Sequence, residues 1–214
     1  EVVINEPEGG IDYLFNLYIQ DEIKPWDDNF KFIVGTKLEY NIYTHLEVQP
    51  NVRTLYHIND KNQIWASASR SVRTPTRIQV DSQISGYTSA AQFYQIIGNE
   101  DVTSETLASY EMGYRTQPTK KMFFDLVGYA HHYDDLITFI PAAPISIEGV
   151  AVTPYPTVNG MAGEVHGGSV SADVVFTDWW KVKSYYQQRQ EARLRAANQE
   201  VLIVEGEGFF MSLR

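Results

Sequence analysis

The chain has 214 residues, of which 43% are hydrophobic and 13% are aromatic, and it contains no cysteine. Its formal net charge of −10 argues against nucleic-acid binding, because a phosphate backbone requires a basic surface. The lack of cysteine excludes disulfides and thiolate metal sites. No apolar run is long enough for a transmembrane helix, which leaves membrane β-barrels open. The opening EVVINEPEGG has neither a methionine nor a signal peptide, so we expect a processed chain or an interior piece of a longer one.

Apolar and polar residues alternate from residue 13 onward, which is the pattern of strands with two different faces. Three successive runs, 13–23, 30–41 and 45–58, alternate almost without error. Such runs are longer than ordinary soluble strands of about five or six residues, and they approach the ~9–11 residues of a tilted strand that crosses a bilayer. Together with weaker runs, the alternation predicts strands over 13–23, 30–41, 45–58, 63–72, 104–115, 121–133, 168–177 and 181–186.

Connections of two kinds separate these runs. The short connections, rich in turn residues, are 24–29, 59–62, 116–120 and 178–180. The segments 73–103 and 135–167 are long and rich in Gly, Ser, Thr and Pro. Short turns at one end and long loops at the other are typical of outer-membrane barrels. We therefore predict an all-β fold, an antiparallel up-and-down transmembrane β-barrel segment with about eight to ten strands of a larger barrel.

A soluble β-sandwich with one wet face also alternates, and it is the main alternative fold. In a sandwich, however, the polar face looks outward, whereas the cleaner face of this chain is the apolar one. Tyrosines near the strand ends fit an aromatic girdle at a lipid interface. They are Tyr13, Tyr40, Tyr56, Tyr110 and Tyr114.

The predicted domain, a partial barrel, covers residues 1–214. Residues 1–12 are expected to be a loop, 13–186 to hold the strands and loops, and 187–214 to form an atypical C-terminal tail. The tail begins with QQRQEARLRAANQE, which is polar and lacks β-branched residues, so we expect a short solvated helix or a loop over 187–200. After it, VLIVEGEGFFMSLR predicts one more strand or hairpin around Gly206 and Gly208.

The stretch YAHHYDDL (129–136) collects side chains that can ligate a metal ion. On a strand, however, neighbours point to opposite faces, so His131 and His132 cannot share an ion, and neither can Asp134 and Asp135. We predict no metal site here. We interpret the stretch as the outer end of an upward strand, with His131 on the lumen side, His132 on the lipid side, and the aspartates where the chain leaves the membrane for a loop.

Four segments in series resemble the C-terminal half of the barrel of a TonB-dependent outer-membrane receptor. LYIQDEIKP (17–25) is similar to the family's strand with Gln-Asp-Glu, and FIVGTKLEYNIYTHLEVQPNVRTLYHI (32–58) to the hairpin that follows. IWASASRSVRTPTR (64–77) resembles its W-x-x-x-S-R-x-x-R-x-P stretch, which leads into a long external loop. ETLASYEMGYRTQPTKKMFFDLVGYAHHYDDL (105–136) resembles its hairpin with Tyr-Glu-x-Gly-Tyr-Arg.

The resemblance implies a transport protein in the outer membrane of a Gram-negative bacterium. The expected function is TonB-coupled uptake of a scarce nutrient such as a ferric siderophore or cobalamin, with oligosaccharides as a further substrate class. The implied partners are the TonB complex, acting through a plug domain missing from this chain, outer-membrane lipid and a small chelate. A passive porin-like channel and a soluble carbohydrate-binding β-sandwich remain alternatives.

We expect ligand-binding residues in the two long loops, because loops on a rigid scaffold carry recognition. Arginines near the mouth of the first loop suit anionic chelates, since guanidinium matches carboxylate geometry, and loop aromatics supply contact area. The alternative roles are loop anchoring by salt bridges and packing between loops. The candidates are Arg70, Arg73, Arg77, Tyr87, Phe93, Tyr94 and Tyr155.

Glu111 and Arg115 lie on the same lumen-facing side of one predicted strand, so an ion pair between them is plausible, with a structural role as the simpler reading. We find no catalytic or phosphate-binding motif, neither G-x-S-x-G, HExxH, a P-loop nor a dinucleotide fingerprint. We therefore predict that the protein is not an enzyme and that it needs no cofactor.

Overall fold

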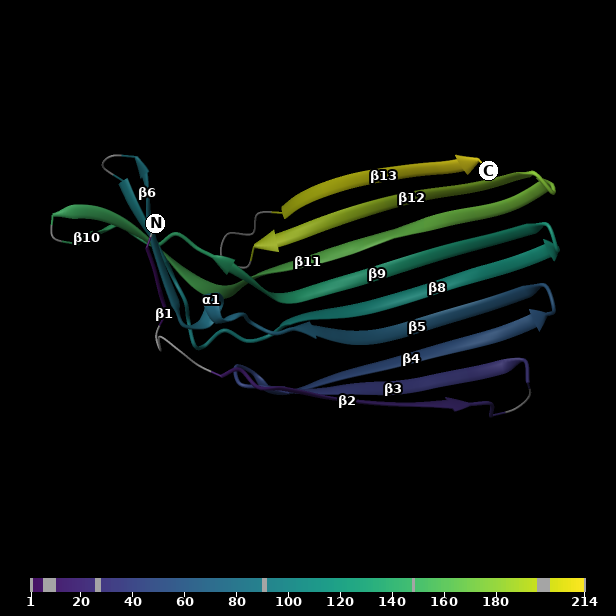
Figure 1. Ribbon diagram of the computed structural model, residues 1–214, viewed down its shortest axis with the longest axis horizontal. Coiled ribbons are helices and arrows are strands. Elements are labelled where there is room, and N and C mark those ends of the chain that lie inside the picture. Colours follow the sequence, from purple (N-terminus) through teal and green to yellow (C-terminus); the bar gives the residue numbers. More distant parts are fainter. Residues whose placement is uncertain are drawn as a thin grey trace.

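The computed structural model describes residues 2–5, 11–25, 28–89, 92–147, 149–195 and 201–213. Over these residues the chain forms one sheet of thirteen strands with a single helical turn. Its larger part is an antiparallel meander in which each strand pairs with its neighbours along the sheet (Figure 1). The meander contains, in spatial order, β2 (Leu14–Ile23), β3 (Phe30–Asn41), β4 (His45–Asn59), β5 (Asn62–Arg73), β8 (Glu105–Thr119), β9 (Met122–Phe139), β11 (Val150–Thr177), β12 (Trp180–Arg195) and β13 (Val201–Leu213).

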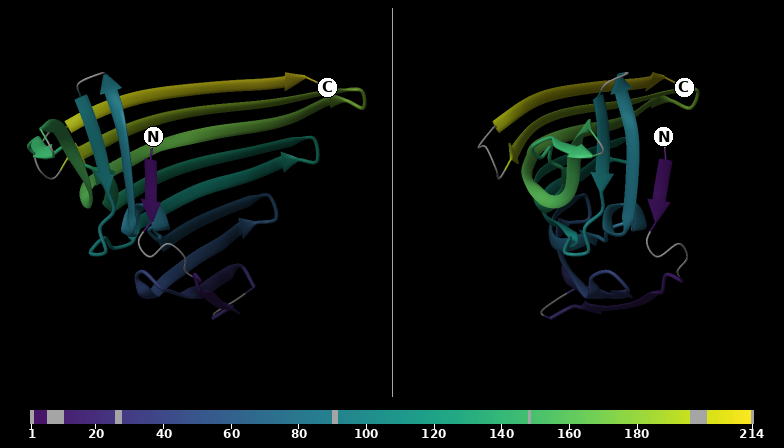
Figure 2. Two further views of the ribbon diagram at one scale, coloured as in Figure 1. Left: turned by 60° about the vertical axis from the view of Figure 1, so that its left-hand side comes forward. Right: turned by 90° about the vertical axis from the view of Figure 1, so that its left-hand side faces the viewer.

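The meander curves into an open gutter, with β2 and β13 at the two ends of its arc (Figure 2). Short turns join the strands at one end, and the long connections lie at the other, which we call the long-loop end; the short connection 42–44 between β3 and β4 also lies at the long-loop end. The all-β, up-and-down barrel segment predicted from the alternation is thus confirmed. The sandwich alternative is wrong, because the described strands form one curved sheet and not two stacked sheets.

A smaller set of strands stands at the long-loop end. In it β1 pairs with β6, β6 with β7, and β7 runs parallel to the first part of β11, while β10 pairs with β11. These elements lie in segments that we predicted to be loops, so the loop predictions for 1–12, 73–103 and 135–167 are wrong in part. The elements are β1 (Val2–Asn5), α1 (Arg77–Val80), β6 (Ser82–Ser89), β7 (Gln92–Ile97) and β10 (Ile145–Ile147).

The first part of β11 was not predicted as a strand, because its prolines and glycines interrupt the alternation of apolar and polar residues. Pro154 and Pro156 have no N–H, yet their carbonyls accept hydrogen bonds from Ala142 (2.8 Å) and Ile140 (3.3 Å). Proline is tolerated in a strand where only its carbonyl is needed. Further along β11, Gly167 stands where an added Cβ would lie 2.2 Å from the Gln188 carbonyl oxygen. A glycine-rich strand shows no apolar alternation, and the pattern failed here for that reason.

The tail is also a strand. β12 continues to Arg195, so the predicted helix or loop over 187–200 is wrong for residues 187–195, and 196–200 lie outside the described residues. The single strand β13 confirms the strand expected around Gly206 and Gly208. The polar composition of 187–195 reflects a strand that has left the apolar zone, where both faces of the sheet can be wet.

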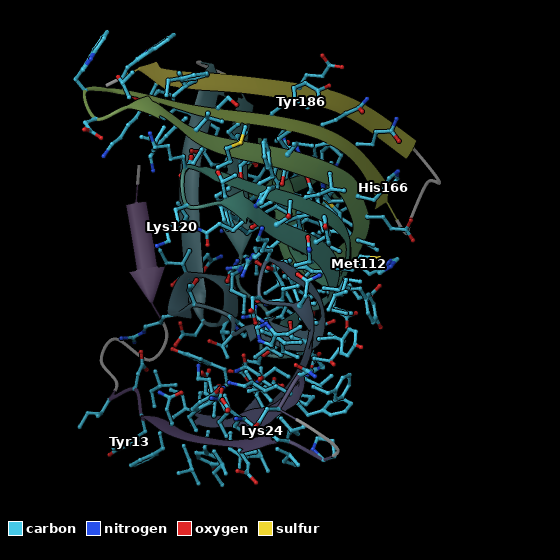
Figure 3. The ribbon with its side chains drawn as sticks, turned by 90° about the vertical axis from the view of Figure 1, so that its right-hand side faces the viewer. Tyr13, Lys24, Met112, Lys120, His166 and Tyr186 are labelled. Carbon is cyan, nitrogen blue, oxygen red and sulfur yellow. The ribbon has the colours of Figure 1, made fainter. Side chains whose placement is uncertain are left out.

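The two faces of the gutter differ sharply. On the outer, convex face, large apolar side chains are exposed, among them Val52, Tyr110, Leu126 and Met112, of which Figure 3 labels Met112. On the inner face, polar and charged side chains dominate. Among the described residues, the only buried hydrophobic side chains are Trp65 and Val102. The sheet therefore has almost no core of its own, and its apolar surface faces outward, as a lipid-facing strand requires.

The apolar zone of the outer face ends along a line of polar residues toward the long-loop end. Because barrel strands tilt, a membrane plane should cut obliquely across them. From β5 to β13 this line moves toward the short-turn end by about one residue position per strand on average. Arg70 pairs in register with Ala108, and Ala108 with His132. The line consists of Arg70, His132, His166, Gln188 and Glu207.

Candidate functional site

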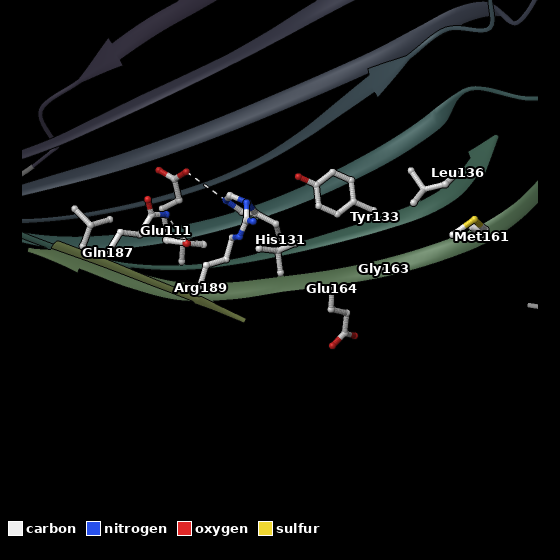
Figure 4. Close-up of a pocket in the computed structure, with 12 residues that line it drawn as sticks. Glu111, His131, Tyr133, Leu136, Met161, Gly163, Glu164, Gln187 and Arg189 are labelled. Atoms are coloured by element: carbon white, nitrogen blue, oxygen red, sulfur yellow. Dashed lines mark hydrogen bonds and ion pairs between the residues drawn. The ribbon is translucent and has the colours of Figure 1, made fainter. Parts of the chain in front are cut away.

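A pocket of about 590 Å³ lies on the inner face across β8, β9, β11 and β12 (Figure 4). Its apolar lining includes Leu136 and Met161. Glu164 also borders the pocket, but Figure 4 shows its carboxylate on the other side of β11 from the labelled polar groups. The polar lining residues are Glu111, Tyr129, His131, Tyr133, Gln187 and Arg189.

His131 is at the centre of this wall. Its Nε2 atom lies 3.6 Å from Glu111 Oε1, and its ring stacks on Tyr129 with centroids 5.1 Å apart. Gln187 Nε2 donates to the hydroxyl oxygen of Tyr129 over 2.8 Å. Tyr129 can extend across β11 because Gly167 has no side chain: a Cβ there would come within 2.8 Å of the hydroxyl. The wall thus offers phenol, imidazole, carboxylate and amide groups to whatever fills the lumen.

A second inner-face cluster surrounds Trp65, nearer the short turns. Its side chain is 6% exposed and lies over Gly113, where a Cβ would be 2.5 Å from Trp65 Nε1. The guanidinium carbons of Arg53 and Arg115 lie 5.5 and 5.4 Å from the indole centroid, within cation–π range. Sequence reasoning did not single out Trp65. The sequence signal that could have identified it is a tryptophan at a position where the alternation of the strand otherwise places polar residues.

The predicted ion pair between Glu111 and Arg115 is wrong. Arg115 Nε donates instead to Asp125 Oδ2 across the hairpin at 2.9 Å, and Glu111 pairs with His131. The partners on the neighbouring strand are directly opposite or diagonal, whereas residues four apart on one strand are too distant to touch.

The predicted loop-mouth arginines do not form one basic group. Arg73 lies on the inner face and makes a two-point ion pair with Glu105. Arg77 is on α1, with its Nε 3.4 Å from Asp81 Oδ2. Arg70 lies on the outer face, where its Nη1 donates to the carbonyl oxygen of Val48 over 2.8 Å. Their proposed role in ligand binding stays a prediction.

Glu105 joins three strands at the long-loop end, outside the apolar zone. Its carboxylate accepts from Arg73 on β5 and, over 2.8 Å, from the backbone N–H of Ile137 on β9. Burial raises the pKa of this carboxyl, but the hydrogen bonds from Arg73 and Ile137 lower the pKa by more than burial raises it. The pKa of Glu105 therefore lies below its ordinary value. The same hydrogen bond raises the pKa of Arg73, against the opposing effect of its burial.

Asn159 and Thr157 on β11 anchor the C-terminal part of the long segment 73–103. Asn159 accepts from the Thr103 N–H over 2.8 Å and donates to the Thr103 carbonyl over 3.0 Å. The fully buried Thr157 donates to the Ile97 carbonyl over 2.9 Å. None of these residues was predicted, because an anchoring amide in a loop-like sequence has no distinctive spacing.

The predicted aromatic residues lie on the small set of strands, in two groups. Tyr87 and Phe93 pair across β6 and β7 with ring centroids 6.3 Å apart, and both are exposed. Tyr94 and Tyr155 share the opposite face, since Tyr94 is in register with Thr153 and Tyr155 with Ile96. Their proposed contact with a ligand stays a prediction.

The YAHHYDDL stretch is placed as expected in one respect and not in another. His131 faces the inner side and His132 the outer side, as the strand interpretation predicted. The expectation that a loop begins at Asp134 and Asp135 is wrong, because β9 continues to Phe139. The two aspartates instead form a bulge against β11, and Asp135 has a φ of 57°. Among the described residues, no three His, Asp or Glu side chains gather to hold a metal ion.

Comparison with known proteins decides the family. The model described as "TonB dependent receptor-like, beta-barrel" matches residues 8–201. The chain belongs to the TonB-dependent receptor β-barrel family. No curated protein sequence matches it significantly. Within the described residues, no helix is long and apolar enough to cross a membrane.

Solved structures of siderophore receptors and of an outer-membrane transporter share the fold. The siderophore receptor PirA of Pseudomonas aeruginosa is 14% identical with a TM-score of 0.70, over 94% of this chain and 41% of that one. The ferric enterobactin receptor PfeA of the same species is 12% identical with a TM-score of 0.68, over 92% and 32%. The outer-membrane transporter YddB of Escherichia coli is 13% identical with a TM-score of 0.68, over 95% and 31%. The chain thus spans about two fifths or less of these structures.

Proposed function

We propose that this chain is the wall of an outer-membrane receptor that takes up a scarce nutrient with energy delivered through TonB. The family match over residues 8–201 carries the proposal. The two-faced sheet supports it: an apolar outer face suits lipid, and a polar inner face suits a lumen through which a hydrophilic solute passes.

The proposed substrate class is a ferric siderophore, cobalamin or a similar chelate. Two of the structural neighbours are described as siderophore and ferric enterobactin receptors, which supports iron chelates first. The pair Tyr87 and Phe93 is the best placed of the predicted contacts, because both side chains are exposed and lie on β6 and β7, in the set of strands at the long-loop end. Arg73 is the next candidate on the inner face.

Uptake in cells tests the proposal. Iron-limited cells that lack the gene should lose accumulation of at least one chelate from a panel of radiolabelled ferric siderophores and cobalamin. The gene carried on a plasmid should restore it, but only in cells with an intact TonB complex. Uptake that persists without TonB would identify a passive channel instead.

Changes in the loop aromatics test the site. Replacing Tyr87 and Phe93 together by alanine should weaken chelate binding, since aromatic side chains supply much of the contact area at such sites. Tyr18 on β2, exposed but outside the long-loop end, is the matched control. If the variant with alanine at Tyr87 and Phe93 binds the chelate as tightly as the Tyr18→Ala control, the aromatic pair is not part of the binding site.

A further inference from the structure

The strand β11 belongs both to the barrel wall and to the smaller set of strands at the long-loop end. Its residues 152–156 pair with β7, and its residues 157–174 pair with β9. We call β1, β6, β7 and residues 152–156 of β11 the end sheet, and Figure 2 shows its strands standing across the direction of the meander strands. Because β11 changes partner between Pro156 and Thr157, the angle of the end sheet to the wall is set close to that point.

The backbone near this change of partner is irregular on both paired strands. On β11 the register shifts between Asn159 and Met161 and again between Met161 and Gly163. On β9, beside these shifts, Asp135 has a φ of 57°, a left-handed conformation that is unfavourable for a residue with a side chain. Bulges bend a strand and increase its local twist. The regular ladder is thus interrupted where the end sheet joins the wall, and side-chain contacts are needed to fix its angle.

Asn159 supplies such contacts. Its Oδ1 accepts the N–H of Thr103 over 2.8 Å, and its Nδ2 donates to the carbonyl of Thr103 over 3.0 Å and to that of Asp135 over 2.6 Å. A primary amide has one acceptor oxygen and two N–H donors, and the oxygen and both donors are used here. The side chain therefore joins three segments: the bulge of β9, β11 itself, and the chain that returns from β7 to β8.

The returning chain, residues 98–104, is held at a second point. Asn99 Nδ2 donates to the Thr157 carbonyl over 3.1 Å. Val102, which lies between this contact and that of Asn159, is 4% exposed. The end sheet is therefore connected to the wall on two sides, through β11 and through the returning chain.

We infer that Asn159 is a positioning residue that holds the end sheet at one angle to the barrel wall. The aromatic pair Tyr87 and Phe93 lies on this sheet, so the place of the pair relative to the inner face depends on that angle. The inference rests on the proposed function, in which the pair contacts the chelate. It gives Asn159 a part in chelate binding that requires no contact between Asn159 and the chelate.

The variant Asn159→Asp tests this role with almost no change in shape. It keeps the acceptor for the Thr103 N–H, but it replaces both N–H donors by an oxygen that faces two carbonyl oxygens. We expect the end sheet to take a range of angles in this variant. The matched control is Asn62→Asp, which removes an amide donor to Asn59 at the short-turn end.

Distances between two spin labels measure the angle. The chain has no cysteine, so cysteines introduced at Gln83 on β6 and at Lys120 at the short-turn end carry the labels. Double electron–electron resonance on the whole protein in detergent should give one narrow distance distribution for the original protein and for Asn62→Asp. The distribution should be broad for Asn159→Asp.

Chelate binding gives the functional readout. The probe is the ferric siderophore or cobalamin that the uptake panel selects. Its dissociation constant should rise about tenfold in Asn159→Asp, because apparent affinity falls with the fraction of molecules in the binding orientation. Asn99→Asp loses only the contact with Thr157, so we expect a rise of about threefold, and this milder variant serves if Asn159→Asp does not fold. Asn62→Asp should bind like the original protein.

Three results would overturn the inference. The first is a narrow, unchanged distance distribution in both Asn159→Asp and Asn99→Asp. The second is a broadened distribution with unchanged chelate affinity, and the third is weaker binding without any change in distance. A lack of TonB-dependent uptake by the original protein would instead contradict the proposed function. The label distances require no chelate, so they still decide whether Asn159 fixes the end sheet.

Discussion

The outer and inner faces of the same strands use opposite chemistry. On β9, Leu126 projects outward and is 52% exposed, while its neighbour Val127 borders the inner pocket. In the proposed outer-membrane location, lipid would cover the large exposed side chains of the outer face, which makes them favourable there. On the inner face, polar side chains bind one another in cross-strand pairs. A residue's effect on this protein therefore depends first on which face it occupies, and adjacent residues provide matched tests.

The largest expected effect separates the two faces directly. Leu126→Arg should destabilise the folded protein in lipid vesicles by about 2–4 kcal/mol, the cost of a cation on the lipid face near the bilayer midplane. Val127→Arg, one residue away, should cost much less because the inner face is polar. Denaturant titration of the vesicle-inserted protein measures both, and equal losses would break the distinction between the faces.

A smaller effect is expected where the inner face is tightly packed. Gly113→Val should cost about 1–3 kcal/mol, because the new side chain must displace Trp65, and overpacking has costs of this size. Gly128→Ala on the next strand is the control, since the nearest atom to its Cβ would be 4.0 Å away. The same titration applies, with tryptophan fluorescence as the readout. An unchanged free energy of unfolding for Gly113→Val would mean that the Trp65 side chain can move aside without cost.

The contacts of Glu105 with Arg73 and Ile137 should make the stability of the long-loop end depend on pH. Because its pKa in the folded protein lies below the ordinary value of 4.5, its contribution to stability is present above that pH and is lost as the pH falls through the folded-state pKa. Glu105→Gln should cost about 1.5–3 kcal/mol at neutral pH, as the loss of hydrogen bonds to a charged group does.

Limited proteolysis of residues 74–104 in intact cells measures the contribution of the Glu105 contacts to the stability of this segment. Cleavage should increase in the original protein as the medium is acidified below the ordinary carboxyl pKa. In the Glu105→Gln variant it should already be raised at neutral pH and change less on acidification. Parallel pH profiles for the two proteins would contradict the assignment.

The smallest effect is expected for an exposed inner-face pair. Lys183 Nζ lies 3.1 Å from Asp173 Oδ2, with side chains 67% and 44% exposed. Lys183→Ala should change the free energy of unfolding by less than about 1 kcal/mol, since water screens such pairs. A larger loss in the vesicle titration would show that the pair is shielded from water in the whole protein.

The sequence predicted the long strands of the meander well and the long-loop end poorly. Strands such as β3 and β4 have one lipid face and one wet face, so their alternation records the environment of every residue. β12 beyond Gln187 and β11 before Gly163 are strands in which both faces can be polar or crowded by glycine and proline. Alternation cannot report pairing when neither face is apolar.

The candidate site divides in the same way. Residue type and parity placed Glu111, Tyr129 and His131 on the inner face. They did not reveal that Arg115 pairs with Asp125 or that Glu105 joins three strands, because cross-strand register is not written in either strand alone. Parity on one strand separates Arg70 from Arg73, but it could not show that Arg70 bonds to the Val48 carbonyl or that Arg73 pairs with Glu105.

The sequence by itself determined the period-two pattern, the two faces of each long strand, and the resemblance that the family match confirms. Only the tertiary structure decided how the strands at the long-loop end pair, where the apolar zone ends and which charges pair. The physical reason is range. Alternation depends on each residue's own environment, whereas register, the oblique boundary and the cross-strand ion pairs arise from contacts between strands distant in sequence.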